Sequence, residues 1–387
     1  MATERKLSDN TAIRGGDRPL RVLIVRIGAM GDVLHAMPAV AALRELHPEW
    51  FIGWAIEPGW SELLQACADF EQMSCGAGRS ERMPLVDQWH QVPAKAWRER
   101  PFGVSTVLDI NAMRRELLMW DYDVCVDMQG SLKSAIVGRM AAARVFAGPT
   151  EPRERQARWF YKQQVSTIAP HVVEQGCELL GGALEEILRP AKVVLPVDAE
   201  AEAWCDRLLI QTLGHGLGHG ERFAFIAPTA GWGAKQWPAE RYGAVVAELG
   251  RAGYRSLVNE VLGDRTADEV IATSEGFATL VPCSIGQMIA LVRRAGVVIA
   301  GDTGPLHLAA ALGRPVVGLY GPTDPARNGP YRTFGTEARA RVLRHKSSTR
   351  DHSRRSETEA GLMQITTDEV VEAALALLKV GQGKVNV

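Results

Sequence analysis

The chain has 387 residues, 46% hydrophobic and 23% charged, which is an ordinary globular composition and a length that predicts two domains. Its 44 basic and 45 acidic side chains give a formal net charge of -1, so no overall field attracts nucleic acid or a membrane, although a local basic patch is compatible with this balance. Six scattered cysteines without a C-x-x-C pair argue against a zinc knuckle or disulfide scaffold and suit a reducing cytosol.

The first half of the chain predicts an α/β domain. Residues 1–20 form a polar extension without the apolar core of a signal peptide, and no apolar run is long enough to span a bilayer. We therefore expect a cytoplasmic protein, either free or peripheral at a membrane. Residues 21–25 are consecutively apolar after Arg21, which predicts a strand buried on both faces. A helix is expected over 33–46, kinked or restarted at Pro38, and "YDVCVDMQGSLKSAIVGRMAAARV" repeats the strand, turn and helix order.

A second series of strands and helices follows a linker near residues 189–199, where "LRPAKVVLPVDAEAEAW" contains two prolines. "FAFIAPTAG" predicts a strand and loop, "AERYGAVVAELGRAGY" a helix, and "GVVIAGDTGPLHLAAALGRPVVGLYGPTDP" a complete βαβ unit. "TTDEVVEAALALLKV" predicts a final helix capped by Thr366 or Thr367. We expect two Rossmann-like domains that face each other across a cleft, with a polar loop and helix after them: residues 21–190, 200–345 and 346–387.

The segment "AGDTGPLHLAAALGRP" combines several features of an anion site. Asp302, Thr303 and Gly304 form a turn after a strand, Pro305 suits the first helical position, and His307 lies in the first turn. Free backbone amides, a hydroxyl, a small residue and an imidazole at one helix N-terminus favour a diphosphate. The alternative is a capped helix, with Asp302 or Thr303 as the cap and His307 in the core or on the surface.

A second loop, "APTAGWGAKQWPAERYG", lies at the same predicted sheet edge. Thr229 ends a strand and Lys235 precedes the next helix, so the lysine could neutralise a phosphate as a mobile charge. The alternative is a solvated lysine on a flexible loop.

The turn in "RVLIVRIGAMGDVLHAMPAVAALREL" carries a carboxylate instead of a phosphate site. Gly28 and Gly31 give G-x-x-G without the G-x-G-x-x-G of dinucleotide-binding folds, which argues against an NAD-dependent oxidoreductase. Asp32 repels phosphate, and a carboxylate that faces an anion site across a cleft suits a general base. The alternative is that Asp32 only caps the helix.

Asp121 and Asp123, in "DYD", resemble a metal–nucleotide motif but precede a strand, so we interpret them as a solvated strand start and predict no metal site.

These segments together resemble the lipopolysaccharide heptosyltransferases of glycosyltransferase family nine. The segments at Asp32 and at Asp302 carry the resemblance, and "YDVCVDMQGSLKSA" and "EPRERQARWFY" lie between them in the expected order. The resemblance extends from about residue 21 to 380. It is greatest to members that add the first heptose to the Kdo residue of the inner core.

The resemblance implies a GT-B fold with an N-terminal acceptor domain, a C-terminal nucleotide-sugar domain and a final helix that returns to the first domain. It also implies an inverting reaction without a metal. The implied donor is ADP-L-glycero-β-D-manno-heptose, which is a substrate, so no cofactor is expected. The implied acceptor is of the Kdo–lipid A type, at the cytoplasmic face of the inner membrane, and no nucleic-acid partner is expected.

Matching motifs assign roles to individual residues. Asp32 would be the catalytic base, and Glu260 or Asp264 would bind the ribose unless that contact is absent. The acceptor residues would be Lys133 and Arg153, with Lys95 and Arg98 as secondary candidates. The donor residues would be Thr229, Lys235, Asp302, Thr303, Gly304 and His307. The alternatives are a family-nine transferase with another sugar or acceptor, and an inactive nucleotide-sugar-binding protein.

Overall fold

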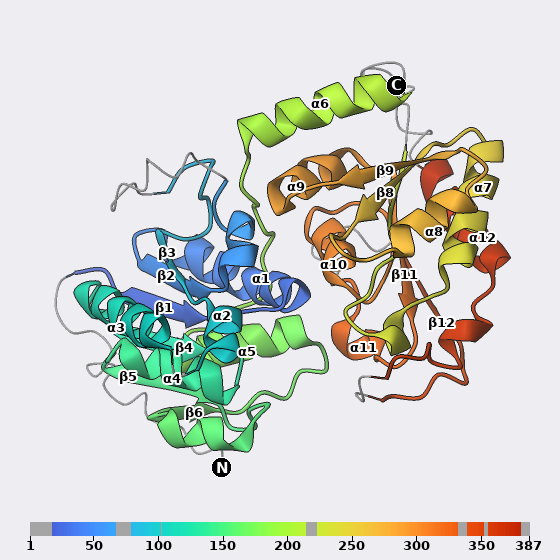
Figure 1. The fold of residues 1–387 in the computed structure, drawn as a ribbon. Helices are drawn as coiled ribbons and strands as arrows, with labels where there is room; N and C mark the ends of the chain where they lie inside the picture. The colour runs from blue at the N-terminus through green and yellow to red at the C-terminus, as the bar shows by residue number, and fades with distance from the viewer. Residues whose placement is uncertain are drawn as a thin grey trace, which may run out of the picture.

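The structure, a computed structural model, describes residues 18–66, 79–101, 103–213, 223–331, 339–351 and 355–380. Most of the expected polar extension, residues 1–17, therefore lies outside the described residues. Two six-stranded parallel sheets with flanking helices dominate this part of the chain (Figure 1). None of the described helices is long and apolar enough to cross a membrane.

The first domain is built on a sheet with the strand order β3-β2-β1-β4-β5-β6. The four apolar residues of β1 are buried, as the consecutive pattern predicts. The strands are β1 (Arg21–Val25), β2 (Phe51–Ile56), β3 (Gln88–Gln91), β4 (Val124–Asp127), β5 (Val145–Pro149) and β6 (Gln163–Val165). The helices are α1 (Met30–Leu46), η1 (Pro58–Leu63), α2 (Ala94–Glu99), α3 (Val104–Met119), α4 (Leu132–Met140), η3 (Arg155–Phe160) and α5 (Val172–Leu184).

The second domain has a sheet with the equivalent order β12-β11-β10-β7-β8-β9. Its strands are β7 (Ala224–Ala227), β8 (Ser256–Glu260), β9 (Ala278–Pro282), β10 (Val297–Gly301), β11 (Val316–Tyr320) and β12 (Ala340–Arg344). Its helices are α6 (Ala199–Leu213), η4 (Gly233–Lys235), α7 (Ala239–Arg251), α8 (Thr266–Ala272), α9 (Ile285–Arg294), α10 (Gly304–Ala311), α11 (Pro325–Asn328), η6 (Leu362–Gln364) and α12 (Thr367–Val380).

Helix α1 begins three residues earlier than expected, at Met30, and runs through Pro38 to Leu46. The proline removes one interior amide donor, and its own carbonyl also accepts a hydrogen bond from the Ala191 amide at 3.1 Å. The helix therefore contacts the start of the linker at the residue where the sequence predicts a kink or a restart.

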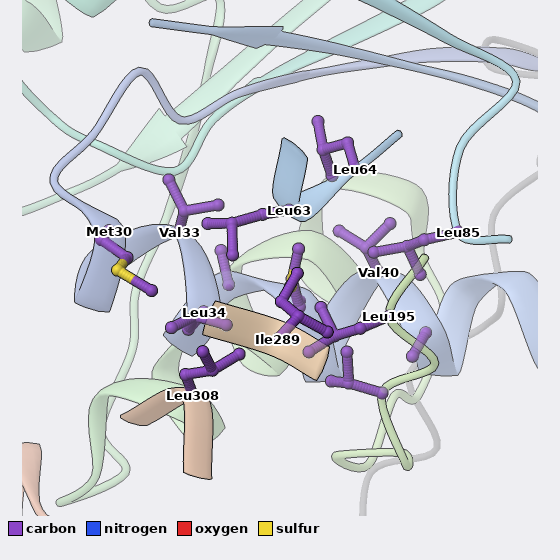
Figure 2. Packing of buried hydrophobic residues seen from close by; sticks show 14 of the residues in the cluster. Met30, Val33, Leu34, Val40, Leu63, Leu64, Leu85, Leu195, Ile289 and Leu308 are labelled. Atoms are coloured by element: carbon purple, nitrogen blue, oxygen red, sulfur yellow. The ribbon is translucent and has the colours of Figure 1, made fainter. Parts of the chain in front are cut away.

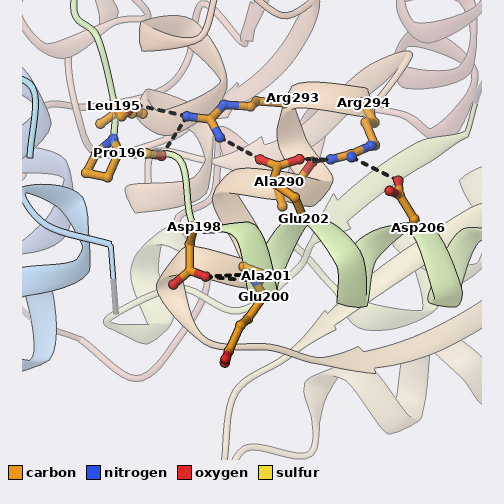
Figure 3. A network of polar contacts seen from close by, with 10 residues as sticks. All are labelled: Leu195, Pro196, Asp198, Glu200, Ala201, Glu202, Asp206, Ala290, Arg293 and Arg294. Atoms are coloured by element: carbon orange, nitrogen blue, oxygen red, sulfur yellow. Dashed lines mark hydrogen bonds and ion pairs between the residues drawn. The ribbon is translucent and has the colours of Figure 1, made fainter. Parts of the chain in front are cut away.

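Two neighbouring arginines of α9 hold the linker and α6 against the second domain (Figure 3). Arg293 donates to the carbonyl oxygens of Leu195 and Pro196 at 3.0 and 2.7 Å, and it pairs with Glu202 of α6 at 2.6 Å. Arg294 pairs with the other oxygen of the same carboxylate. These contacts fix α6 against α9, so the second domain begins in the linker and includes α6.

One apolar cluster joins the two domains (Figure 2). It contains Met30 and Leu34 of α1, Leu195 of the linker, Ile289 of α9 and Leu308 of α10. The N-terminal part of α1 packs directly against α10. The contact between the domains is therefore partly a continuous core.

The final helix does not return to the first domain, so that part of the expected GT-B architecture is wrong for the described residues. α12 packs against α7 and the strands β10, β11 and β12. Val370 and Ala374 share a buried cluster with Trp237 and Tyr242 of the second domain. Thr366 caps α12, as one of the two predicted caps: its hydroxyl accepts from the Glu369 amide, and the Glu369 carboxylate accepts from the Thr366 amide.

Candidate active site

Asp32 lies in the first turn of α1 but does not cap it. The N-cap residue is Ala29, and no side chain caps this end of the helix. The Asp32 carboxylate is 41% exposed and forms an ion pair with Arg26 at 3.0 Å. The capping alternative for Asp32 is therefore wrong, and its carboxylate is accessible to an acceptor hydroxyl.

The turn before Asp32 is held by the loop after β4. The side-chain oxygen of Gln129 accepts from the amides of Ile27 and Gly28, at 2.9 and 3.3 Å. Asp127, fully buried at the end of β4, accepts in turn from the amides of Gln129 and Gly130. Sequence reasoning missed this support, although an aspartate before a glycine turn was a usable signal.

The buried Asp127 carboxyl is a second, unexpected feature of this loop. Burial raises the pKa of Asp127, while hydrogen bonds from Tyr161 and Ser134 to its second oxygen act in the opposite direction. Two of the four donors to Asp127 are amides of the loop itself, Gln129 and Gly130, and the other two are side chains on α4 and at the end of η3. The carboxyl therefore fixes the loop and, through Gln129, the turn that presents Asp32.

In the second domain, the structure brings three predicted donor residues together. Lys235 pairs with one oxygen of Asp302 at 2.6 Å, and Nε2 of His307 lies 3.0 Å from the other oxygen. Because an ionised carboxylate only accepts hydrogen bonds, Nε2 of His307 is the donor in this contact. Lys235 is therefore ordered and paired, which contradicts the alternative of a solvated lysine on a flexible loop.

The charge state of Asp302 follows from these partners. Burial alone would raise the pKa of Asp302, but the hydrogen bond from His307 and the nearby charge of Lys235 hold it well below its usual range. Asp302 is thus a buried carboxylate that orients both the lysine and the imidazole at the N-terminus of α10.

Thr303 and Gly304 begin α10, but their surroundings differ from expectation. Thr303 is the N-cap residue, as the capped-helix alternative predicts, but its side chain makes no capping hydrogen bond; Asp302 is not the N-cap residue. A Cβ at Gly304 would lie 2.4 Å from the sulfur of Met30. The close approach at Gly304 is therefore made by α1 of the other domain.

Thr229 contacts the loop after β8. Its hydroxyl is 3.5 Å from a carboxylate oxygen of Asp264, which also accepts from the Thr266 amide at 2.8 Å. Of the two candidate ribose residues, Asp264 is thus the one that contacts a predicted donor residue.

Three histidines meet at the domain interface, two of which sequence reasoning missed. Nε2 of His35 on α1 lies 3.1 Å from Nδ1 of His307 on α10. His171, the N-cap of α5, has its Nε2 atom 3.1 Å from the carbonyl oxygen of Gly329 in the second domain. Burial first, and the neighbouring charges of His307 and His171 second, hold the pKa of His35 well below its usual value. The sequence held no signal for a contact between residues so far apart.

The predicted acceptor residues are exposed and lie around the loops of the first domain. Lys133 is in the first turn of α4, directly after the loop that holds Gln129. Arg153 is close by, because its backbone packs on Gly130. The Lys95 amide donates to the Glu57 side chain at 3.3 Å. Arg98 is in the last turn of helix α2.

Asp123 is a structural ion-pair residue, so interpreting it as solvated was wrong. Its buried carboxylate binds Arg18 at 2.9 Å and Arg144 at 2.6 Å, at the amino end of β4 and away from the Gln129 loop. Asp121 is largely exposed. Among the described residues, no group of three or more His, Cys, Asp or Glu is arranged to hold a metal ion.

The polar loop before α12 covers the glycine-rich loop that carries Lys235. The Ala234 amide donates to the carbonyl of Arg355, and the Glu359 amide donates to the carbonyl of Ala234. Thr358 donates to the Gln236 carbonyl at 2.8 Å. This loop therefore helps to hold the segment on which Lys235 lies. A pocket of about 510 Å³ opens beside it, but its lining contains none of the six predicted donor residues.

Comparison with known proteins establishes the family. The family model "Glycosyltransferase family 9 (heptosyltransferase)" matches residues 110–358. The chain belongs to this family. The transferase is 29% identical over 329 residues to lipopolysaccharide heptosyltransferase 1 of Escherichia coli K12, covering 81% of this chain and 91% of the relative. It is 26% identical to the Pseudomonas aeruginosa protein of the same name, covering 81% of each chain.

Solved structures agree with this assignment. The E. coli heptosyltransferase WaaC with ADP has a TM-score of 0.71 and 25% identity, and the match covers 92% of the transferase and 100% of WaaC. WaaC with ADP-2-deoxy-2-fluoro heptose has a TM-score of 0.68 at 25% identity, with 91% and 98% covered. The expected GT-B fold of two Rossmann-like domains is thereby confirmed, and the protein is a glycosyltransferase.

Proposed function

We propose that the transferase moves heptose from ADP-L-glycero-β-D-manno-heptose to the Kdo residue of the lipopolysaccharide inner core, with inversion and without a metal. The relatives named lipopolysaccharide heptosyltransferase 1 support the reaction, and the WaaC complexes with ADP and an ADP-heptose analogue support the donor. One observation carries the mechanism. The Asp32 carboxylate is accessible and is not used as a helix cap, and it lies across the domain contact from the Lys235–Asp302–His307 group.

In this mechanism Asp32 takes the proton of the acceptor hydroxyl while the oxygen of that hydroxyl attacks the anomeric carbon of the donor. The bond from that carbon to the diphosphate breaks, and negative charge develops on the ADP leaving group. The N-terminal amides of α10 and the Lys235 ammonium stabilise this charge. Asp302 positions Lys235 and His307, because it contacts both of them.

The acceptor binds on the first domain through the cations around the Asp32 turn, chiefly Lys133 and Arg153, with Lys95 and Arg98 beyond them. A Kdo–lipid A acceptor carries carboxylate and phosphate groups, which guanidinium and ammonium groups bind well. We place the reaction at the cytoplasmic face of the inner membrane, where such a lipid acceptor would be embedded.

The test is a transfer assay with ADP-heptose and Kdo-terminated lipid A, with product identified by mass and the anomeric configuration by NMR. Product formation that disappears in Asp32→Ala supports the proposal. Transfer only with another nucleotide sugar or another core acceptor would favour a different family-nine activity. Tight ADP-heptose binding without any transfer would favour an inactive nucleotide-sugar-binding protein.

A further inference from the structure

Helix α3 carries apolar side chains on two opposite faces. Met113 and Leu117 are buried on the inner face, against the sheet. The outer face is also apolar: Val104 is 76% exposed, Leu108 60% and Met119 72%, and Val107 and Leu118 lie beside them. An apolar face that remains uncovered over a whole helix is unusual for a monomeric surface and marks a site of contact.

The charges of α3 are distributed unevenly around its axis. At about 100° per residue, Arg115 lies about 20° from Val104, in the middle of the exposed apolar face. Arg114 flanks that face, whereas Asp109 and Glu116 lie about 120–140° away from Val104. The outer face of α3 therefore combines apolar side chains with Arg115 and the exposed Asn111, and it carries no carboxylate.

Helix α4 and η3 extend this surface on the same side of the sheet. α4 contacts both α3 and η3, and the inner faces of the three pack in one cluster. On α4, Leu132 and Ile136 are exposed beside Lys133 and Arg139. Trp159 of η3 is 76% exposed.

We call this surface the basic–apolar face. Its apolar members are Val104, Val107, Leu108, Leu118, Met119, Leu132, Ile136 and Trp159, and its basic members are Arg114, Arg115, Lys133, Arg139, Arg153, Arg155 and Arg158.

The described part of the chain does not neutralise the cations of the basic–apolar face. None of its seven basic residues forms an ion pair with another described residue. Residues 104–119, 132–140 and 151–160 contain seven basic and four acidic side chains, in a chain whose formal net charge is -1. Of those four acidic residues, Glu116 contacts His90 and Glu154 accepts from the Leu132 amide.

We propose that the basic–apolar face docks on the surface of an anionic phospholipid bilayer. Exposed apolar side chains enter the boundary of the acyl chains, Trp159 suits the polar–apolar interface, and the seven cations meet lipid phosphates. A second copy of the chain fits less well. A two-fold contact would place the cations of one face against the same cations of its copy.

The position of this face relative to the site fits an acceptor anchored in the bilayer. The face begins at Lys133 and Arg153, at the loop whose Gln129 holds the turn before Asp32. A lipid headgroup at this edge would therefore reach the first domain next to the catalytic carboxylate. This link to the acceptor rests on the proposed function, whereas bilayer docking itself does not.

The test measures co-sedimentation of the full chain with vesicles, in the absence of donor and acceptor. We expect binding to vesicles of phosphatidylethanolamine and phosphatidylglycerol, weakened by salt, and little binding to phosphatidylcholine alone. Leu108→Gln with Met119→Gln, and separately Arg114→Glu with Arg115→Glu, should each lower partitioning by at least about tenfold. All four side chains are outside the donor and catalytic groups, so ADP affinity and melting temperature should stay unchanged.

Matched control variants lie elsewhere on the surface. Ile187→Gln with Leu262→Gln removes two side chains that are 90% and 99% exposed, and Arg207→Glu reverses an exposed charge on α6. These controls should bind vesicles like the wild type. Failure of the wild type to bind anionic vesicles, or an equal loss in the controls, overturns the proposal. So does self-association in sedimentation experiments that is abolished by the α3 variants while vesicle binding persists. Because no substrate is present, these outcomes are independent of transferase activity.

Discussion

Nε2 of His35 lies 3.1 Å from Nδ1 of His307, so a single hydrogen bond connects α1 of the first domain with α10 of the second. His307 also donates from Nε2 to Asp302, which holds Lys235. The first and second domains are therefore connected through His307 and Asp302, the residues that hold Lys235 in place. In the tautomer of His307 that carries its proton on Nε2, the Nδ1 atom is an acceptor, and His35 is then the donor.

This contact predicts acid sensitivity near pH 6. The folded-state pKa of His35 is lowered by burial and by His307, so below about pH 6.5 the unfolded chain binds more protons than the folded one. The stabilisation is complete above about pH 6.5 and is lost as the pH falls toward the folded-state pKa. The melting temperature should fall between pH 6.5 and 5, and less steeply in His35→Gln. His345→Gln, outside the interface, is the control, and identical slopes in all three proteins would contradict the prediction.

Asp32→Asn should give a folded, donor-binding and nearly inactive enzyme. Asparagine keeps the shape but cannot accept the proton, so kcat should fall by about 10²–10⁴-fold. The melting temperature should change little, because Asp32 caps nothing and its partly exposed ion pair with Arg26 contributes about 1 kcal/mol. Asp268→Asn is a matched control at the same position of α8, in the first turn. Near wild-type turnover in Asp32→Asn would eliminate the general-base role.

Lys235→Ala should weaken ADP binding by roughly 1.5–3 kcal/mol, the range for a hydrogen bond to a charged group. It should also lower the melting temperature, because it leaves Asp302 buried with only His307 as a charged or polar side-chain partner. Calorimetric titration with ADP measures the first effect and thermal unfolding the second. Lys192→Ala, an exposed lysine on the linker, is the control. An unchanged ADP affinity would remove Lys235 from the donor site and leave it a structural residue.

Raising the ionic strength should increase the acceptor KM more than the donor KM. The proposed acceptor residues Lys133, Arg153, Lys95 and Arg98 are exposed, so salt screens them, whereas the Lys235–Asp302 pair is mostly buried and is screened less. Steady-state kinetics at about 0.05 and 0.5 M salt with a soluble, delipidated acceptor would test this without a bilayer. Equal responses of the two constants would count against a basic acceptor site.

Activity should survive EDTA. Stabilisation of the diphosphate is assigned to the α10 amides and Lys235, and Asp123 is already occupied by Arg18 and Arg144. Turnover after chelation and desalting should equal that of the untreated enzyme. Loss of turnover that magnesium or manganese restores would contradict the metal-independent mechanism.

Local patterns in the sequence predict much of the fold and where the candidate site residues lie along it. The consecutive apolar residues of β1 and β10 predict buried parallel strands, and the polar turns after them place Asp32 and Asp302 at sheet edges. Such signals depend on neighbouring residues, so one sequence is enough to detect them.

Contacts between distant residues were not predictable in the same way. Lys235 and Asp302 were each expected at a donor phosphate, but their mutual pairing depends on the distance between β7 and β10. His35 meets His307 only because the two domains dock. The prediction that α12 returns to the first domain was wrong for the same reason. Its amphipathic pattern predicts a buried face without specifying the domain that covers that face.

The shared core has a consequence for synthesis on the ribosome. Leu34 belongs to the same cluster as Leu308, and His35 and His307 are separated by 272 residues of chain. At about 5–20 residues per second, the docking side of α1 emerges roughly 15–55 s before α10 exists to cover it. During that interval the first domain presents an apolar strip beside an unpaired histidine. The nascent chain should therefore bind holdase chaperones through α1, and release should coincide with the appearance of α10.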